Sequence, residues 1–209
     1  NRLLIPDVEQ ILLKFQKGEI DYGNQRLLLD HVAILKQNES QGNYVTYLWP
    51  TVVGAIRRYI LNLTVKDTVL RPIFNDIRFR QALSLAINRE EINKTLQFGL
   101  GTPRQFTAPD SASYYEDWMG KYYAQYDPKQ ASTLLDAMGL KMDTAKGLRL
   151  RPDGQPLEII MDDATTGNEK MDALIKEYWK AIGVGVTFNY VARDLYASRT
   201  QSNSTQGGV

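Results

Sequence analysis

Hydrophobic residues recur along the chain at two spacings that alternate with each other. Apolar residues three and four positions apart predict amphipathic helices, and apolar residues at every second position predict strands. The helical spacing covers residues 8–17, 27–36, 77–87, 89–98, 128–138 and 169–182. The strand spacing covers residues 19–22, 45–49, 59–63, 148–150, 157–161 and 184–190. This order of elements predicts an α/β fold with a mixed sheet.

Polar residues at helix starts and glycines at helix ends sharpen these boundaries. Side chains that can cap a helix N-terminus precede four of the helices: Asp7, Asp76, Asn88 and Asp127. Gly18, Gly139 and Gly183 follow the last apolar residue of three helices, as expected for C-caps. Pro152-Asp153-Gly154 predicts a hairpin turn between two strands.

The domain organisation follows from this continuous alternation. Because the chain has no internal repeat and no low-complexity block, residues 1–199 are expected to form a single α/β lobe. Residues 200–209 are rich in Ser, Thr, Asn and Gly and are expected to form a frayed C-terminal tail. The chain starts with Asn and shows no export signal at its start, so we expect it to begin inside a longer protein.

Composition favours binding over chemistry. The 209 residues contain no cysteine and one histidine, His31, which excludes disulfides, thiol nucleophiles and cysteine-ligated metal sites. Twelve tyrosines and three tryptophans supply flat contact surface. A net charge of +1 gives no basic footprint for nucleic acid. No glycine-rich phosphate loop follows a predicted strand, and no cofactor is expected.

The segment 162–168 is the strongest candidate for ligand binding. It connects a predicted strand to a helix, and in open α/β sheets ligands bind beyond the carboxyl ends of strands, near helix N-termini. Its side chains that could hydrogen-bond a polar ligand are Asp163, Thr165, Thr166 and Asn168. The alternative is that Thr166 and Asn168 only cap the helix. Asp162-Asp163 is a poor acid–base pair, because neighbours on a strand point to opposite faces.

Two further segments could contribute to a binding surface. Residues 21–25 have the same strand-to-helix placement, with Tyr22 and Gln25 as candidate contacts, so both connections could converge on one cleft. Residues 101–126 are irregular but carry aromatic side chains without helical spacing: Tyr114, Tyr115, Trp118, Tyr122 and Tyr123. Some of these should pack the segment down, and one or two could form a platform for a sugar or a peptide side chain.

One stretch of sequence resembles the signature of a known family. It runs from Asn75 to Arg89 and reads Asn-Asp-Ile-Arg-Phe-Arg-Gln-Ala-Leu-Ser-Leu-Ala-Ile-Asn-Arg. Other pieces resemble the same family in the same order: Gly18-Glu19-Ile20-Asp21, Leu61-Asn62-Leu63-Thr64, Tyr126-Asp127-Pro128 with the helix after it, and Trp179 to Val186. The family is that of the family 5 extracellular solute-binding proteins of ABC importers, the oligopeptide, dipeptide and nickel binding group.

The resemblance implies a lobe of the type II periplasmic-binding-protein kind, with a mixed sheet flanked by helices. Such a chain would be lobe II of a bilobed protein, with its tail near the crossover to lobe I of the same parent chain. The resemblance further implies non-covalent capture of an oligopeptide or oligosaccharide, outside the cytoplasmic membrane, and delivery to a membrane permease. The parent would be periplasmic or extracytoplasmic, either lipid-anchored or free.

The same resemblance implies where a ligand would bind. It points to the loop that matches residues 163–168 and to the segment that matches residues 191–199. In the second segment Tyr196 could stack on a ligand, and Arg199 could pair with a carboxylate or with sugar hydroxyls. The alternative is that this segment is only the start of a helix, with Arg199 exposed.

Two other functions stay open at this point. A solute-sensing domain of a regulatory protein would have the same fold, and a helix-turn-helix module upstream in the parent would favour it. An enzyme would depend on His31 or on the pair Asp162-Asp163.

Overall fold

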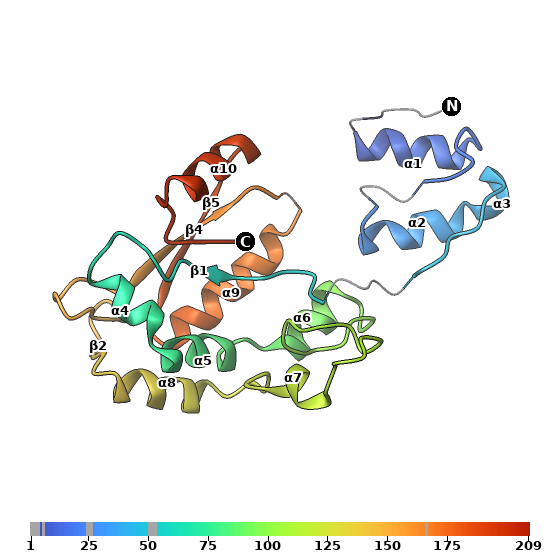
Figure 1. Cartoon of the computed structure of the whole chain (residues 1–209). Coiled ribbons are helices and arrows are strands. Elements are labelled where there is room, and N and C mark those ends of the chain that lie inside the picture. The colour runs from blue at the N-terminus through green and yellow to red at the C-terminus, as the bar shows by residue number, and fades with distance from the viewer. Residues whose placement is uncertain (1–4, 6, 24–26, 50–53, 166) are drawn as a thin grey trace. The chain divides into compact units, whose positions relative to one another are not determined.

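The chain divides into two compact units, residues 1–51 (unit 1) and residues 52–209 (unit 2). Figure 1 shows the computed structural model, which describes residues 5, 7–23, 27–49, 54–165 and 167–209. The sequence predicts a single lobe over residues 1–199, because its alternation of elements continues across residue 51 without a linker-like composition.

Unit 1 consists of short helices around a small apolar core. They are α1 (Val8–Gln16), the 3-10 helix η1 (Leu29–His31), α2 (Val32–Gln37) and α3 (Glu39–Gly42). Leu12 and Phe15 of α1 are buried together with Leu35 of α2. The ring of Tyr44 meets Phe15 edge-on, with the ring centroids 5.4 Å apart. Asp7 caps α1, as the sequence predicts.

The strands predicted at residues 19–22 and 45–49 are wrong, because the described part of unit 1 contains only helices and loops. A strand needs a neighbouring strand to satisfy its backbone hydrogen bonds, and no such neighbour lies in that part of the unit. The apolar side chains of these segments are largely exposed, as Tyr22 and Trp49 show. Their alternation therefore does not mark the buried face of a sheet.

Unit 2 contains strands and helices in mixed order (Figure 1). The strands are β1 (Ile60–Leu61), β2 (Met142–Asp143), β3 (Leu148–Arg149), β4 (Glu158–Asp163), β5 (Gly185–Tyr190) and β6 (Gly207–Gly208). The helices are α4 (Leu70–Asn75), α5 (Ile77–Leu85), α6 (Arg89–Leu96), α7 (Asp117–Lys121), α8 (Pro128–Ala137), α9 (Glu169–Ala181) and α10 (Arg193–Gln201).

The helices with the clearest sequence signals are confirmed. Side chains of Asp76, Asn88 and Asp127 accept hydrogen bonds from the first turns of α5, α6 and α8, respectively. The sequence missed α4 and α7, which have six and five residues and lack a side-chain cap. Such short helices are held by packing rather than by their own pattern. Residues 101–126 are otherwise irregular, as predicted.

The main sheet is mixed, as predicted, with the strand order β1-β6-β4-β5. β4 and β5 pair in parallel from Glu158 opposite Gly185 to Asp163 opposite Tyr190. β6 runs parallel to β4, and β1 runs antiparallel to β6. β2 and β3 form a separate antiparallel pair. The carboxyl ends of β4 and β5 therefore lie side by side at one edge.

The last residues of the chain are not the frayed tail that their composition suggests. Residues 207–208 form β6, which is inserted between β1 and β4. Both are glycines, and a Cβ on Gly207 would lie only 2.8 Å from the Ile60 carbonyl oxygen and from Met161. The missing side chains that made this segment look like a loop are what let it fit inside the sheet.

The two faces of β4 differ in burial. Ile159 and Met161 are fully buried in the core that α4, α5, α8 and α9 build against the sheet, whereas Ile160 on the other face is 47% exposed. Trp179 of α9 anchors this core, and its indole N–H donates to the Leu83 carbonyl oxygen at 3.0 Å. The hydrophobic core of unit 2 therefore lies between the sheet and helices α4, α5, α8 and α9.

We predict that shortening a side chain in this core destabilises unit 2. Leu135→Ala removes a fully buried side chain of α8, which packs against α5, and should lower the free energy of unfolding by about 2–5 kcal/mol. Urea denaturation followed by circular dichroism measures the change. The matched control is Leu195→Ala on α10, whose side chain is largely exposed and should cost less than about 1 kcal/mol. Equal losses for both variants would contradict this core.

Candidate functional site

The carboxyl ends of β4 and β5 bring two of the predicted ligand segments together. The loop between β4 and α9 starts after Asp163, and the connection from β5 to α10 starts after Tyr190. These two residues are register partners, and the Val191 N–H donates to the Asp163 carbonyl oxygen at 2.8 Å. The loop chosen on physical grounds and the segment implied by the resemblance therefore meet at one end of the sheet.

Asp162 and Asp163 point to opposite faces of β4 and have different partners. Asp162 accepts hydrogen bonds of 2.8 Å from Asn189 and from Arg199 of α10. Asp163 turns to the face covered by α9. Figure 1 shows α9 and α10 on either side of β4 and β5. The predicted separation of this acidic pair is confirmed, so the two carboxylates do not form one acid–base unit.

A buried guanidinium organises the α9 side of this sheet end. The side chains of Arg57, Asp163 and Asp172 are 4%, 1% and 1% exposed, respectively. Nη2 of Arg57 donates to Asp163 Oδ2 at 2.5 Å and also to Asp172 Oδ2, and its Nε donates to Asp172 Oδ1 at 3.1 Å. Nη1 donates to the Thr165 hydroxyl at 2.7 Å. One cation thus joins the strand end, the loop after it and α9.

Two tyrosines complete the coordination of Asp172. The Tyr59 hydroxyl donates to Oδ1 at 2.9 Å, and the Tyr190 hydroxyl donates to Oδ2 at 3.0 Å. Tyr59 also packs edge-on against Trp179, with centroids 5.7 Å apart. Burial and the nearby Asp172 carboxylate raise the pKa of Tyr59, and the same causes raise that of Tyr190 to about 12. Both hydroxyls therefore keep their protons and remain donors at neutral pH.

The pKa of Asp163 reflects a competition between burial and hydrogen bonding. Burial alone would raise it, but hydrogen bonds from Arg57 and from the Thr165 hydroxyl and N–H outweigh burial and lower it below the ordinary 3.8. For Arg57, burial favours the neutral form, yet its two carboxylate partners raise its pKa. Asp163 and Arg57 are therefore both ionised at neutral pH, and Asp172 is the second carboxylate that the same guanidinium contacts.

Arg57 was missed at the sequence level, although a signal for it exists. The sequence predicts a strand over residues 59–63, in which Tyr59 and Leu61 share one face. Extending that alternation back by one step places Arg57 on the same face as Tyr59, and both side chains contact Asp172. An arginine at an inward position of a strand is a candidate for a buried ion pair.

The four candidates of the β4–α9 loop have different environments. Asp163 is almost fully buried, so its carboxylate supports the loop rather than facing solvent. Thr165 is exposed, and its hydroxyl lies between Arg57 and Asp163. Asn168 occupies the N-cap position of α9, but its side chain makes no capping hydrogen bond, contrary to the simple capping alternative. Thr166 lies outside the described residues.

The two candidates of α10 are partly buried. Arg199 forms an ion pair of 2.8 Å with Asp162, so it is not the free surface side chain of the alternative interpretation, although its side chain keeps 34% exposure. Tyr196 packs over Gly208 of β6, where a side chain on the glycine would collide with the tyrosine ring. Both residues therefore lie at the sheet end, on the face opposite Arg57.

Two further candidates, Tyr22 and Gln25, belong to unit 1. Tyr22 is 71% exposed, and Gln25 lies outside the described residues. Convergence of the two loops on one cleft stays a prediction. His31, the residue on which an enzyme hypothesis depended, accepts a hydrogen bond of 3.0 Å on Nδ1 from the Leu28 N–H. This is a local contact within unit 1.

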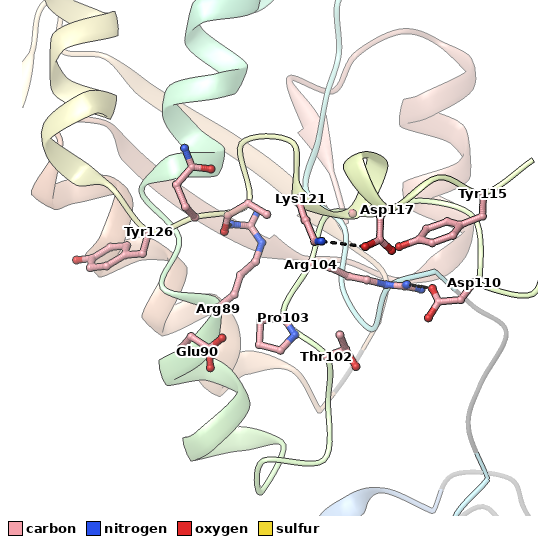
Figure 2. Close-up of a pocket in the computed structure, with 13 residues that line it drawn as sticks. Arg89, Glu90, Thr102, Pro103, Arg104, Asp110, Tyr115, Asp117, Lys121 and Tyr126 are labelled. Carbon is pink, nitrogen blue, oxygen red and sulfur yellow. Dashed lines mark hydrogen bonds and ion pairs between the residues drawn. The ribbon is translucent and has the colours of Figure 1, made fainter.

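A separate cavity of about 460 Å³ lies in the irregular segment 101–126 and at the start of α6 (Figure 2). Figure 2 shows Arg104 turned to Asp110 and Lys121 turned to Asp117, with the second pair 2.9 Å apart. Arg89 donates to the backbone carbonyl oxygens of Ser84, near the end of α5, and of Ala124, and burial lowers its pKa to about 10. Most charges of this cavity are thus satisfied within the protein.

The aromatic residues of this segment partly pack on one another. Trp118 meets Tyr122 edge-on at 6.2 Å between centroids, and Tyr122 meets Tyr123 at 4.7 Å. Tyr115 and Tyr126 line the cavity of Figure 2. The segment therefore combines loop packing with exposed rings, and the platform role predicted for it is untested. Among the described residues, no group of three or more His, Asp or Glu side chains could hold a metal ion.

Comparison with known proteins identifies the family. The model for bacterial extracellular solute-binding proteins, family 5 Middle, matches residues 3–208. The chain belongs to this family. Its members are solute-binding proteins rather than enzymes, in agreement with the preference for binding drawn from composition. No helix in the described ranges is long and apolar enough to cross a membrane.

Individual relatives agree with this assignment. The oligopeptide-binding protein OppA of Bacillus subtilis is 26% identical over 203 residues, which are 94% of this chain and 34% of that protein. A solved structure of an oligopeptide-binding protein OppA is 39% identical, with a TM-score of 0.80, over 98% of this chain and 33% of that one. A mannohexaose-bound protein of Thermotoga maritima, named as a periplasmic oligopeptide-binding protein, shares the fold at 21% identity and a TM-score of 0.68, over 98% of this chain and 38% of that one. The chain spans about a third of the length of the curated relatives that it matches over most of its own length.

Removing the cation of the buried cluster should cost more than removing one of its anions. Arg57→Met leaves two buried carboxylates without a counter-ion and should lower the free energy of unfolding by about 3–5 kcal/mol. Asp163→Asn leaves one cation facing one anion and should cost about 1–3 kcal/mol. Urea denaturation at neutral pH compares the two variants. A larger loss for Asp163→Asn would contradict this charge balance.

The lowered pKa of Asp163 predicts a contribution to acid sensitivity. A carboxylate whose pKa is lower in the folded state than in the unfolded state stabilises the fold above its ordinary value of 3.8. That contribution disappears as the pH falls through the folded-state value. The difference in free energy of unfolding between the wild type and Asp163→Asn should therefore be constant near neutral pH and shrink below about pH 4. Parallel pH curves for the two proteins would contradict the prediction.

Proposed function

We propose that this chain is part of the substrate-binding component of an ABC importer. It would capture an oligopeptide outside the cytoplasmic membrane and deliver it to the membrane permease. The observation that carries the proposal is the family match over residues 3–208, together with the 39% identity to an oligopeptide-binding protein over 98% of the chain.

We propose the carboxyl end of β4 and β5 as the ligand-binding surface of unit 2. In open α/β sheets this is where ligands bind, and two loops meet there in this chain. The proposed contacts are Thr165, Thr166, Asn168, Tyr196 and Arg199, with Asp163 supporting the loop from below. Tyr22 and Gln25 of unit 1 stay as proposed contacts from a second segment.

The chain would act as one lobe of a bilobed parent, with another lobe closing over the ligand. Its coverage of only about a third of its curated relatives supports a longer parent. In hinge-type binding proteins, closure of two lobes buries the ligand. Ligand binding is therefore expected from the whole parent rather than from this chain alone.

An oligosaccharide is the second candidate ligand, and a specific observation favours keeping it. A relative of the same fold binds mannohexaose, although its 21% sequence identity to this chain shows only that the fold is shared. The described part of unit 2 exposes several aromatic rings, including Tyr114, Trp118 and Tyr122, on which sugars could stack. A solute-sensing domain of a regulator is a third possibility, which a DNA-binding module in the parent would favour and an export signal would eliminate.

The proposal is tested with the full-length parent, purified without refolding. Native mass spectrometry should detect co-purified peptides, and thermal-shift titration with pentapeptide and nonapeptide pools should raise the midpoint of unfolding. Ligand at about one hundred times its dissociation constant stabilises the folded state by roughly 2.7 kcal/mol. Mannohexaose is the parallel arm. A shift with the sugar alone would change the ligand class, and no shift with either would contradict the transport function.

A further inference from the structure

We infer that Arg57 is a positioning residue that holds the β4–α9 loop in its binding conformation. The inference rests on the proposed function, because it assigns a task to a residue behind the proposed ligand surface. Arg57 itself is buried, so it does not contact a ligand. Its effect would reach the ligand through Thr165, which is exposed in the loop.

The geometry fixes the orientation of the Thr165 hydroxyl. Its oxygen accepts a hydrogen bond of 2.7 Å from Arg57 Nη1 and donates one of 2.7 Å to Asp163 Oδ1. The Thr165 N–H donates to the same carboxylate oxygen at 2.7 Å. A hydroxyl has one hydrogen and two lone pairs, so only one lone pair is left for a ligand, in a single direction. The loop is thereby preorganised at its first turn.

The other side of Arg57 is held equally firmly. Its Nε and Nη2 both donate to the carboxylate of Asp172, which lies in the first turn of α9. The same carboxylate also accepts hydrogen bonds from the hydroxyls of Tyr59 and Tyr190. The loop between Asp163 and Asp172 is therefore clamped at both of its ends by one guanidinium. Loss of the planar, multiply bonded group would free the loop even where the fold survives.

A second buried arginine in unit 2 serves as a natural comparison. Arg149 has a side-chain exposure of 2% and bonds to Asp136 at 2.6 Å, to the Leu140 and Ile182 carbonyl oxygens and to that of Ser132. None of these partners lies in the β4–α9 loop. The two arginines thus share burial and bonding but differ in what they hold.

The experiment measures ligand affinity and stability of full-length parent variants in parallel. The probes are the pentapeptide and nonapeptide pools and mannohexaose, whichever shifts the wild type. Arg57→Lys keeps the charge but cannot make the forked contacts, and it should weaken binding about tenfold, which corresponds to roughly 1.4 kcal/mol. Arg149→Lys should lower the melting temperature comparably and leave the dissociation constant unchanged.

A double-mutant cycle tests whether Arg57 acts through the loop. Thr165→Val removes the hydroxyl that links Arg57 to the loop. Because position 165 is exposed, this variant should fold even if Arg57→Lys does not. Thr165→Ser keeps the hydroxyl and should bind with wild-type affinity. If Arg57 acts through Thr165, the double variant Arg57→Lys with Thr165→Val binds about as weakly as Thr165→Val alone. Additive losses, or equal affinity losses for Arg57→Lys and Arg149→Lys, would overturn the inference. Absence of binding by the wild type would instead contradict the proposed function.

Discussion

The burial of one guanidinium between two aspartates is the interaction on which the carboxyl end of β4 and β5 depends. Moving charged groups out of water costs several kcal/mol each, and it is recovered only when nearly every donor and acceptor is satisfied. In this cluster Arg57 uses Nε and both terminal nitrogens, and the tyrosine hydroxyls occupy the remaining acceptors of Asp172. Because these partners come from β4, α9, β5 and the segment before β1, the cluster forms only when all four are correctly placed.

The main sheet joins β4 and β5 to β1, the strand that directly follows the segment with Arg57 and Tyr59. The strand next to β4 on one side comes from the last residues of the chain, and it is narrow because Gly207 and Gly208 carry no side chains. β6 also pairs with β1, so the backbone of the segment that carries Arg57 and Tyr59 joins the sheet through β6. The position of Arg57 therefore depends on a strand some 150 residues further along the sequence, as expected for a fold with strong non-local pairing.

Capping residues and apolar periodicity in the sequence predicted those helices whose boundaries depend on neighbouring residues. Helices α5, α6 and α8 have a capping side chain before them and a clear apolar face, and they were located correctly from the sequence. Strands were harder, because alternation identifies a strand only if a partner exists. Residues 45–49 alternate and have no partner in the described part of unit 1, whereas Gly207 and Gly208 show no alternation and lie within the sheet. Pairing between distant segments cannot be predicted from the sequence of either segment alone.

The same distinction explains what the sequence could say about the candidate site. The loop after β4 can be predicted from its position between a strand and a helix. Which side chains at this loop support it and which face solvent depends on Arg57, more than a hundred positions away in the sequence. Asp163 has the chemistry of a ligand contact, yet its partner Arg57 keeps it buried and charged. In the proposed binding surface, recognition would then fall to exposed groups such as Thr165, whose orientation the buried charges restrict. Because a loop ordered before binding loses less conformational entropy when it binds, the costly burial of these charges can contribute to affinity without any contact with the ligand.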